Sequence, residues 1–291
     1  MPTVNGVASD MALIEPGDRP SCIYFKIFDV SVAVFCSDPD VYGWLVKGYG
    51  ALASGDRSAS LRYAAGKRAD GSYYLDTAEG ATHTAGSDSE FLYNFEKDLT
   101  LSLQAVRQDL YFIHGAALAL AGQACLFVAP SGSGKSTTTW AALHHGFDYL
   151  SDELAPIDLA KKIIMPYPHA LCLKAVPPAP FTLPAGTLYT ERTIHVPTDC
   201  LPAQVNYDPV PLKAIFFVKY HPDRSEPLIS PISHAEAAAR LYANGLNQLM
   251  HEDSGLPGAV AICQDIPAFE LFTTSHLAPA IQLLRATLLN R

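Results

Sequence analysis

The residues best suited to chemistry form a glycine-rich stretch near the middle of the chain, Ala129-Pro130-Ser131-Gly132-Ser133-Gly134-Lys135-Ser136. An apolar run at 124–128, typical of a short buried strand, precedes it, and residues 137–145 favour a helix after it. A strand, a glycine-rich turn, Lys-Ser and a helix together indicate a phosphate-binding loop. The first position of the usual pattern is Gly and here it is Ala129, a small residue that only a positive φ would exclude.

Each part of this loop has an expected task. The glycines let backbone N–H groups turn inward, and the start of the helix adds unpaired donors and a partial positive charge. Lys135 is expected to reach the β- and γ-phosphates, and the Ser136 hydroxyl to bind Mg²⁺, so ATP and Mg²⁺ are the expected cofactors. The predicted nucleotide-binding residues are Ser131, Gly132, Ser133, Gly134, Lys135, Ser136 and Thr137.

An acidic pair, Asp152-Glu153, follows the strand expected at 147–150 and is the candidate for the remaining chemistry. Neighbours in a strand point to opposite faces, so only one of the two is expected to face the γ-phosphate. Two assignments stay open: Asp152 is the base and Glu153 supports Mg²⁺, or the reverse. A helix cap or turn acid is the structural alternative.

Other polar residues give weaker signals. His114 lies between two apolar stretches, where a core histidine is the alternative, but Gly115 and the nearby glycine-rich loop favour a place at the site. Lys174 ends an apolar stretch and could pair with phosphate oxygens or simply be solvated. Arg192 and His195 are weak candidates for cations on the substrate side.

The first third of the chain is expected to form a small β-rich subdomain at residues 21–88, after a loose arm at residues 1–20. A helix over 89–110 has apolar residues three or four positions apart and is expected to be capped by Asp88 or Ser89. The predicted elements before it are strands at 22–28 and 30–35, a helix at 39–52, a pair of strands within 61–75 and a linker at 77–89.

The rest, residues 89–291, is expected to form the nucleotide-binding domain. Residues 111–121 indicate a strand, His-Gly, and a second strand, and the turn at Gly122-Gln123 implies antiparallel pairing with the strand before the loop. The proline-rich segment 176–211 is expected to be an ordered functional loop. The remaining predictions are strands at 154–158, 163–174, 193–196, 212–220, 258–263 and 268–272, and helices at 233–250 and 277–289.

Composition excludes several classes of protein. The net charge of −9 argues against nucleic-acid binding, which needs a basic face. The six cysteines form no C-x-x-C pair and indicate buried free thiols rather than disulfides or a zinc site. The N-terminus lacks the features of a signal peptide, and no apolar stretch approaches the ~20 residues that span a bilayer. A cytoplasmic location without a membrane partner is therefore expected.

The order His114-Gly115, hairpin, glycine-rich loop, helix and Ser151-Asp152-Glu153 resembles the HPr kinase/phosphorylase family. It is more closely similar to the HPr-kinase-related bacterial kinases, including those of lasso-peptide and other modified-peptide gene clusters. The resemblance covers about residues 111–175 well and the C-terminal part loosely. It implies an α/β (α+β) fold with a P-loop kinase core and a mixed, largely antiparallel sheet, as in phosphoenolpyruvate carboxykinases.

The resemblance also implies roles for single residues. Asp152 would be the base that takes the seryl proton, and Glu153 would replace the second Asp of the family, which helps to hold the metal. Lys174 falls where the family carries the Arg of a Glu-Ile-Arg-Gly signature. Here the stretch reads Cys172-Leu173-Lys174-Ala175, without the Glu. The resemblance therefore still implies kinase activity, while phosphorylase activity and HPr as the substrate are left open.

The first functional hypothesis is an ATP- and Mg²⁺-dependent kinase that phosphorylates a Ser or Thr hydroxyl of a peptide or small protein. A lasso-type precursor peptide is the first substrate to test. The alternatives are a small-molecule kinase on the same core and a nucleotide-binding sensor without transfer activity. Whether the chain forms a homo-oligomer is left open.

Overall fold

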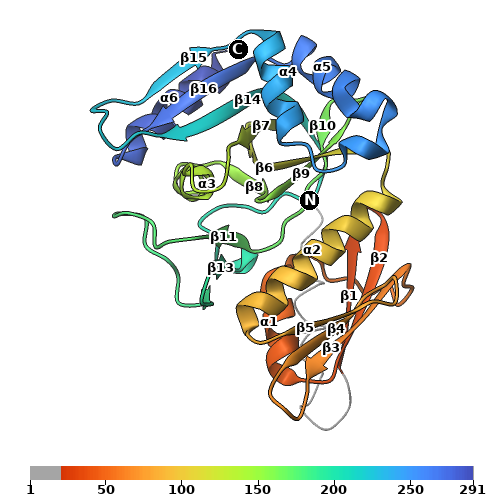
Figure 1. Cartoon of the computed structure of the whole chain (residues 1–291). Helices are drawn as coiled ribbons and strands as arrows, with labels where there is room; N and C mark the ends of the chain where they lie inside the picture. Colours follow the sequence, from red (N-terminus) through yellow and green to blue (C-terminus); the bar gives the residue numbers. More distant parts are fainter. Residues whose placement is uncertain (1–20, 291) are drawn as a thin grey trace, which may run out of the picture.

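The first part of the described chain, residues 21–85, contains a five-stranded sheet (Figure 1). A computed structural model describes residues 21–290, so the arm predicted at residues 1–20 lies outside the described part. The strands, in their order across the sheet, are β1 (Ser21–Ile27), β2 (Val30–Cys36), β3 (Leu61–Lys67), β4 (Tyr73–Asp76) and β5 (Thr82–Ala85). The linker predicted at 77–89 is therefore partly wrong, because β5 pairs with β4 there.

Two helices belong to this sheet. Helix α1 (Pro39–Tyr49) is capped by Asp38 and continues into a short 3-10 turn, η2 (Gly50–Leu52). Helix α2 (Asp88–Val106) is capped by the Ser87 hydroxyl, which accepts a hydrogen bond from the N–H of Glu90, and not by Asp88 or Ser89 as expected. The predicted apolar stripe of α2 is buried in the same core as the strands, at Phe91, Phe95, Leu99 and Leu103.

The packing of α2 bears on how the chain is divided. The sequence places a boundary at residue 88, whereas α2 shares its hydrophobic core with the N-terminal strands. The buried hydroxyls of Tyr63 and Ser102 are hydrogen-bonded between β3 and α2 at 3.1 Å. This packing favours a division nearer residue 107, which we offer as a proposal.

The second sheet is built around the hairpin of β6 (Leu110–Leu120) and β7 (Gln123–Val128), which pair antiparallel as expected. The β6 strand runs unbroken through His114-Gly115, so the two strands predicted there are one. A Cβ atom added at Gly115 would lie 2.8 Å from the carbonyl oxygen of Phe127. Glycine is therefore the residue that lets β6 and β7 approach at this point.

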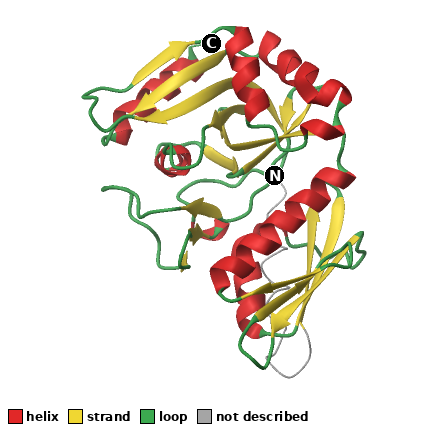
Figure 2. Cartoon of the chain, in the orientation of Figure 1, coloured by secondary structure: helices red, strands yellow, loops and turns green. Residues whose placement is uncertain are grey.

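The full sheet is mixed, in agreement with the α/β fold expected (Figure 2). Strands β7, β14 and β16 are parallel, while all other pairings are antiparallel. The further strands are β8 (Asp148–Ser151), β9 (Leu154–Asp158), β10 (Ile163–Ile164), β14 (Val210–Tyr220), β15 (Leu228–Pro231) and β16 (Ala268–Thr273). Their order is β10-β9-β6-β7-β14-β16-β15, with β8 beside β6 and β10 also paired with β14.

Helices cover both faces of this sheet. Helices α3 (Lys135–Leu143) and α6 (Leu277–Leu289) share one core with Phe127 and Phe216, and helices α4 (His234–Ala243) and α5 (Leu256–Asp265) share another with Leu126 and Ile215. Residues 258–263 were predicted as a strand and are helical. Pro257 favours the first turn of α5, and Ala259, Ile262 and Cys263 are buried at helical spacing.

The predicted helix at 233–250 is also shorter than expected. It is capped by Ser233, the first residue of the predicted range, but it ends at Ala243, and the chain continues through the 3-10 turns η4 (Gln248–Met250) and η5 (Glu252–Gly255). Of the described helices, none has the length and apolar character needed to cross a bilayer. The six cysteines are free thiols, but of these only Cys36, Cys125 and Cys263 are buried as predicted.

Between β10 and β14 the chain is mostly irregular, as expected. A three-stranded sheet is embedded in it, with the order β11 (Leu171–Leu173), β13 (Ile194–Val196) and β12 (Leu188–Tyr189), and a 3-10 turn, η3 (Thr198–Cys200), follows. The strand predicted over 163–174 is thus two short strands in different sheets. Figure 1 shows β11 and β13 below α3, on the side of the molecule that faces α2.

Candidate active site

The glycine-rich loop connects β7 to α3, which begins at Lys135, two residues earlier than predicted. Gly132 and Gly134 have φ values of 85° and 88°, a left-handed conformation that side chains other than glycine rarely adopt. Ala129 is not among the described residues with a positive φ, so the alanine fits where the usual pattern has glycine. The sequence thus folds into the strand, loop and helix that its pattern indicated.

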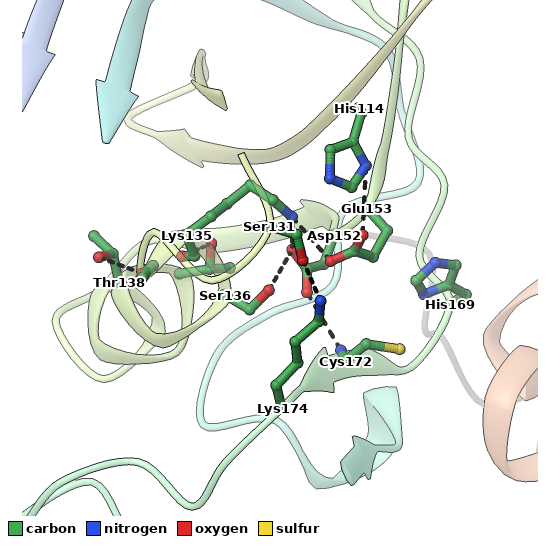
Figure 3. A network of polar contacts seen from close by, with 12 residues as sticks. His114, Ser131, Lys135, Ser136, Thr138, Asp152, Glu153, His169, Cys172 and Lys174 are labelled. Carbon is green, nitrogen blue, oxygen red and sulfur yellow. Dashed lines mark hydrogen bonds and ion pairs between the residues drawn. The ribbon is translucent and has the colours of Figure 1, made fainter. Parts of the chain in front are cut away.

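Lys135 lies at the start of α3 and points into a pair of carboxylates (Figure 3). Its Nζ atom donates to Oδ1 of Asp152 at 3.1 Å and to Oε1 of Glu153 at 3.0 Å. Burial alone would lower the pKa of this ammonium, since the side chain is only 5% exposed. The two carboxylates outweigh that cost and raise the pKa of Lys135 above its ordinary value.

Asp152 lies beneath the loop and is fully enclosed, with 0% of its side chain exposed. Besides Lys135, its Oδ1 atom accepts from the hydroxyl of Ser136 at 3.3 Å. Its Oδ2 atom accepts from the backbone N–H of Cys172 at 3.3 Å, which brings β11 to the site. Both oxygens of this carboxylate are therefore engaged by neighbouring groups of the chain.

Glu153 takes a different position from its neighbour. Its φ of 68° turns the chain between β8 and β9, so its side chain is 31% exposed where that of Asp152 is buried. Its Oε2 atom lies 3.4 Å from Nδ1 of His114. Burial tends to raise the pKa of the Glu153 carboxyl, but Lys135 and then His114 attract its negative charge and hold the pKa below its ordinary value.

A cavity of about 990 Å³ opens beside this cluster. Most of the predicted site residues line it, but Asp152 and Ser133 do not. The predicted residues on its wall are His114, Ser131, Gly132, Gly134, Lys135, Ser136, Thr137, Glu153, Lys174, Arg192 and His195. This cavity thus brings together predicted site residues that are up to 81 positions apart in the sequence, from His114 to His195.

Lys174, which follows β11, and His195 of β13 differ in their surroundings. Lys174 is exposed, and its Nζ atom donates to the hydroxyl of Ser131 in the glycine-rich loop. His195 is 8% exposed, with its Nδ1 atom 3.2 Å from the sulfur of Cys172 and its Nε2 atom 2.7 Å from Oγ1 of Thr193. Burial lowers the pKa of His195 to about 4, so it is neutral at pH 7 and does not supply the cation expected there.

Sequence reasoning missed several residues on the cavity wall. Glu96 of α2 lines the cavity and lies 3.6 Å, between Oε1 and Nε2, from the buried ring of His169. Burial raises the pKa of Glu96, and the charges of Glu153 and Asp152 add to this while His169 opposes it. Tyr220, at the end of β14, packs against the loop, since a Cβ on Gly134 would lie 3.3 Å from the Cβ of Tyr220. Nothing in the spacing of these residues distinguishes them from ordinary surface positions.

The donor set of the cluster suits Mg²⁺. The Ser136 hydroxyl, the Asp152 carboxylate and the Glu153 carboxylate are hard oxygen ligands. Across residues 21–290, no three or more His, Cys, Asp or Glu side chains are arranged to hold a metal by themselves. Mg²⁺ is usually bound by one or two carboxylates together with substrate phosphates.

Comparisons with known proteins give little. No protein-family model matches the sequence, and no curated protein matches it. Among solved structures, the chain is similar to the Hpr(Ser) kinase/phosphatase from Coxiella burnetii, with 15% identity and a TM-score of 0.28, over 62% of this chain and 93% of that one.

Proposed function

We propose that this protein is an ATP- and Mg²⁺-dependent kinase of the HPr-kinase-like type. The observation that carries the proposal is the cluster of buried Lys135 and Asp152 with half-buried Ser136 at the end of a glycine-rich loop. Burying a lysine and a carboxylate costs free energy that their mutual attraction only partly returns. A nucleoside triphosphate with its metal would interact with both the lysine and the carboxylate, which would explain why the chain buries them together.

The loop and the start of α3 supply the phosphate site. The N–H groups at the beginning of a helix point outward without partners and carry a partial positive charge. Lys135 adds a full charge at the first residue of α3, and Lys174 adds a second one above Ser131. These groups favour the phosphates of a nucleotide and stabilise the charge that develops on the transferred phosphoryl group.

Of the two assignments for the acidic pair, the geometry favours Glu153 as the base and Asp152 as the metal-side carboxylate. A base must come within about 3 Å of the hydroxyl that it deprotonates. Glu153 lies on the cavity wall, whereas Asp152 is enclosed and hydrogen-bonded to Ser136. This reverses the roles that the family resemblance implies for the two residues.

Proton transfer then follows from the ion pairs. When phosphates bind, they compete with Glu153 for Lys135, and the carboxylate becomes free to accept the proton of the acceptor hydroxyl. His114, 3.4 Å from Glu153, holds the carboxylate in position. Mg²⁺, held by Ser136, Asp152 and phosphate oxygens, would neutralise charge on the phosphates. We propose a Ser or Thr of a peptide or small protein as the acceptor, with a lasso-type precursor peptide as the first substrate to test.

The test compares two substitutions in the full chain. Glu153→Gln is expected to keep nucleotide affinity and to lower the rate of phosphoryl transfer by about 10²- to 10⁴-fold, the usual contribution of a general base. Asp152→Asn is expected to weaken the binding of Mg²⁺-ATP itself. The exposed Glu226, away from the cavity wall, gives the control Glu226→Gln, which should change neither quantity.

Isothermal titration calorimetry measures the affinity for Mg²⁺-ATP. Mass spectrometry of candidate peptides, after incubation with Mg²⁺-ATP, measures phosphoryl transfer. Loss of transfer in Asp152→Asn with full nucleotide affinity, and an active Glu153→Gln, would restore Asp152 as the base. Absence of nucleotide binding by the unaltered chain would overturn the kinase proposal as a whole.

A further inference from the structure

One face of α2 forms a wall of the cavity along nearly the whole helix. From Ser89 to Gln104, the residues that line the cavity recur three or four positions apart, the spacing of one helix face. The opposite face, with Phe91 and Phe95, is buried in the N-terminal core. The side chains at the two ends of the lining face, Ser89 and Gln104, are buried, and the exposed residues of this face run from Tyr93 to Leu101. At 1.5 Å per residue, this exposed part extends over about 12 Å.

Large apolar side chains stay exposed around this cavity. Five of them lie on its wall, with exposed fractions of 58% for Tyr93, 52% for Leu101, 67% for Val176, 46% for Tyr220 and 40% for Leu246. Two belong to α2, and the others come from separate segments of the chain. Apolar side chains that gather at one opening, instead of being scattered singly, mark a surface that binds a partner.

Glu96 belongs to this α2 wall and interacts electrostatically with the acidic pair Asp152-Glu153. Glu96 lines the cavity together with Glu153, and the negative charge of Glu153 contributes to the raised pKa of Glu96, so the two carboxylates lie within electrostatic reach. The α2 face therefore extends away from the groups that would handle the acceptor hydroxyl. A small polar acceptor would need several convergent polar groups to orient it, whereas the most exposed large side chains of this wall, Tyr93 and Leu101, offer apolar surface.

We propose that the exposed face of α2 binds an extended polypeptide segment that carries the phosphoacceptor. An extended chain rises about 3.3 Å per residue, so an exposed face of about 12 Å accommodates about four residues. The Ser or Thr lies beside Glu153, and large apolar side chains next to it pack against Tyr93 and Leu101. The inference rests on the kinase activity proposed above and adds the surface and the sequence preference by which the substrate is selected.

The experiment uses the full chain with Mg²⁺-ATP and two sets of probes. The first is a library of peptides with a central Ser and randomised flanking residues, and the second is a panel of small hydroxyl compounds. Leu101→Ser and Tyr93→Ser remove apolar side chains from the wall. Val106→Ser is the matched control, because Val106 lies on the same helix, is 52% exposed like Leu101, and does not line the cavity.

The expected result is selection of peptides with large apolar residues beside the Ser. Leu101→Ser should raise the KM of such a peptide about tenfold, the effect of losing one buried apolar side chain, without a matching change in the Kd of the nucleotide. Val106→Ser should leave the KM unchanged. Circular dichroism of each variant verifies that α2 remains folded.

Four results would overturn the inference. Transfer to small hydroxyl compounds but not to peptides, or an unchanged KM in both α2 variants, would reject the α2 wall while leaving the kinase proposal intact. A wild-type dimer that Leu101→Ser dissociates in light scattering would assign the wall to a second copy of the chain. Nucleotide binding without transfer to any probe would also reject the wall, whereas failure to bind nucleotide would reject the kinase proposal itself.

Discussion

The Nζ atom of Lys135 lies 3.1 Å from Oδ1 of Asp152, and the two side chains are only 5% and 0% exposed. An ion pair shielded from water in this way is strong in Coulomb terms but costly in desolvation. Each partner therefore depends on the other, and loss of either leaves an uncompensated charge in the protein interior.

Lys135→Met is expected to lower the free energy of unfolding by about 3–5 kcal/mol, the cost of leaving a buried carboxylate unpaired. It should also abolish the binding of Mg²⁺-ATP. The matched control is Lys161→Met, which breaks a Lys–Asp pair with Asp158 at 3.6 Å in which the lysine is 72% exposed. Exposed pairs contribute about 1 kcal/mol or less. Urea unfolding measures both, and equal losses in the two variants would contradict the dependence on burial.

Lys174→Ala is expected to slow phosphoryl transfer with little change in stability. Lys174 is exposed and contacts the Ser131 hydroxyl, so its charge acts on bound phosphates rather than on the folded core. Removing one such stabilising group lowers kcat by about 10²-fold. Single-turnover kinetics with Mg²⁺-ATP give the rate, and a kcat equal to that of the unaltered chain would exclude Lys174 from the chemistry.

His195 is expected to make the stability of the protein depend on pH. Burial lowers its pKa from the ordinary 6.5 to about 4. Above pH 6.5 the imidazole is neutral whether the chain is folded or unfolded, so the folded state has its full stability. Between pH 6.5 and about 4, only the unfolded chain takes the proton, and stability falls by up to about 1.4 kcal/mol per pH unit.

The measurement compares urea unfolding of the unaltered chain and of His195→Gln, from about pH 7.5 down to about pH 5, under two-state analysis. The difference in unfolding free energy between the two proteins should change steadily below pH 6.5, in favour of the variant. Other histidines titrate in both proteins and cancel in the difference. A difference that is constant over this range would mean that His195 titrates normally.

Gly115→Ala is expected to destabilise the hairpin that leads to the glycine-rich loop. The new Cβ would lie 2.8 Å from the backbone oxygen of Phe127, which cannot move without disturbing β7. We expect a loss of about 1–3 kcal/mol, as for other overpacked sites. Gly43→Ala is the control, because a Cβ there meets nothing within 4 Å and alanine favours a helix such as α1. Thermal unfolding should show opposite shifts for the two variants.

The sequence predicted best the conformation of the glycine-rich loop and of the hairpin before it, because residues close together in the chain determine both. The loop of residues 129–136 was predicted because glycine, lysine and serine at fixed spacing have one strong physical interpretation between a strand and a helix. The antiparallel hairpin before it was predicted from a short turn at Gly122-Gln123. The structure places that turn one residue earlier, at Ala121-Gly122, where both residues have a positive φ. In both cases neighbours in the chain determine the outcome.

The errors arise where distant contacts decide. Residues 258–263 form an apolar run that suits a buried strand as well as a buried helix, and packing of α5 against the sheet selects the helix. The apolar stripe of α2 was predicted, but a stripe reveals only which face is buried. That the other face would line the cavity depends on how the N-terminal sheet packs against the rest of the chain. The difference in exposure between Asp152 and Glu153 likewise depends on the backbone turn at Glu153.

The hydrophobic core of the N-terminal sheet does not end with that sheet. The ring of Phe28 contacts Phe112 of β6 and Tyr167, with centroid distances of 6.0 Å and 5.7 Å, and both partners are fully buried. A fragment that begins at β6 would expose the rings of Phe112 and Tyr167 to water. A fragment that ends before β6 would expose the ring of Phe28. The two parts of the chain are therefore not interchangeable modules: a graft of either onto another protein must carry its own replacement for this shared aromatic contact.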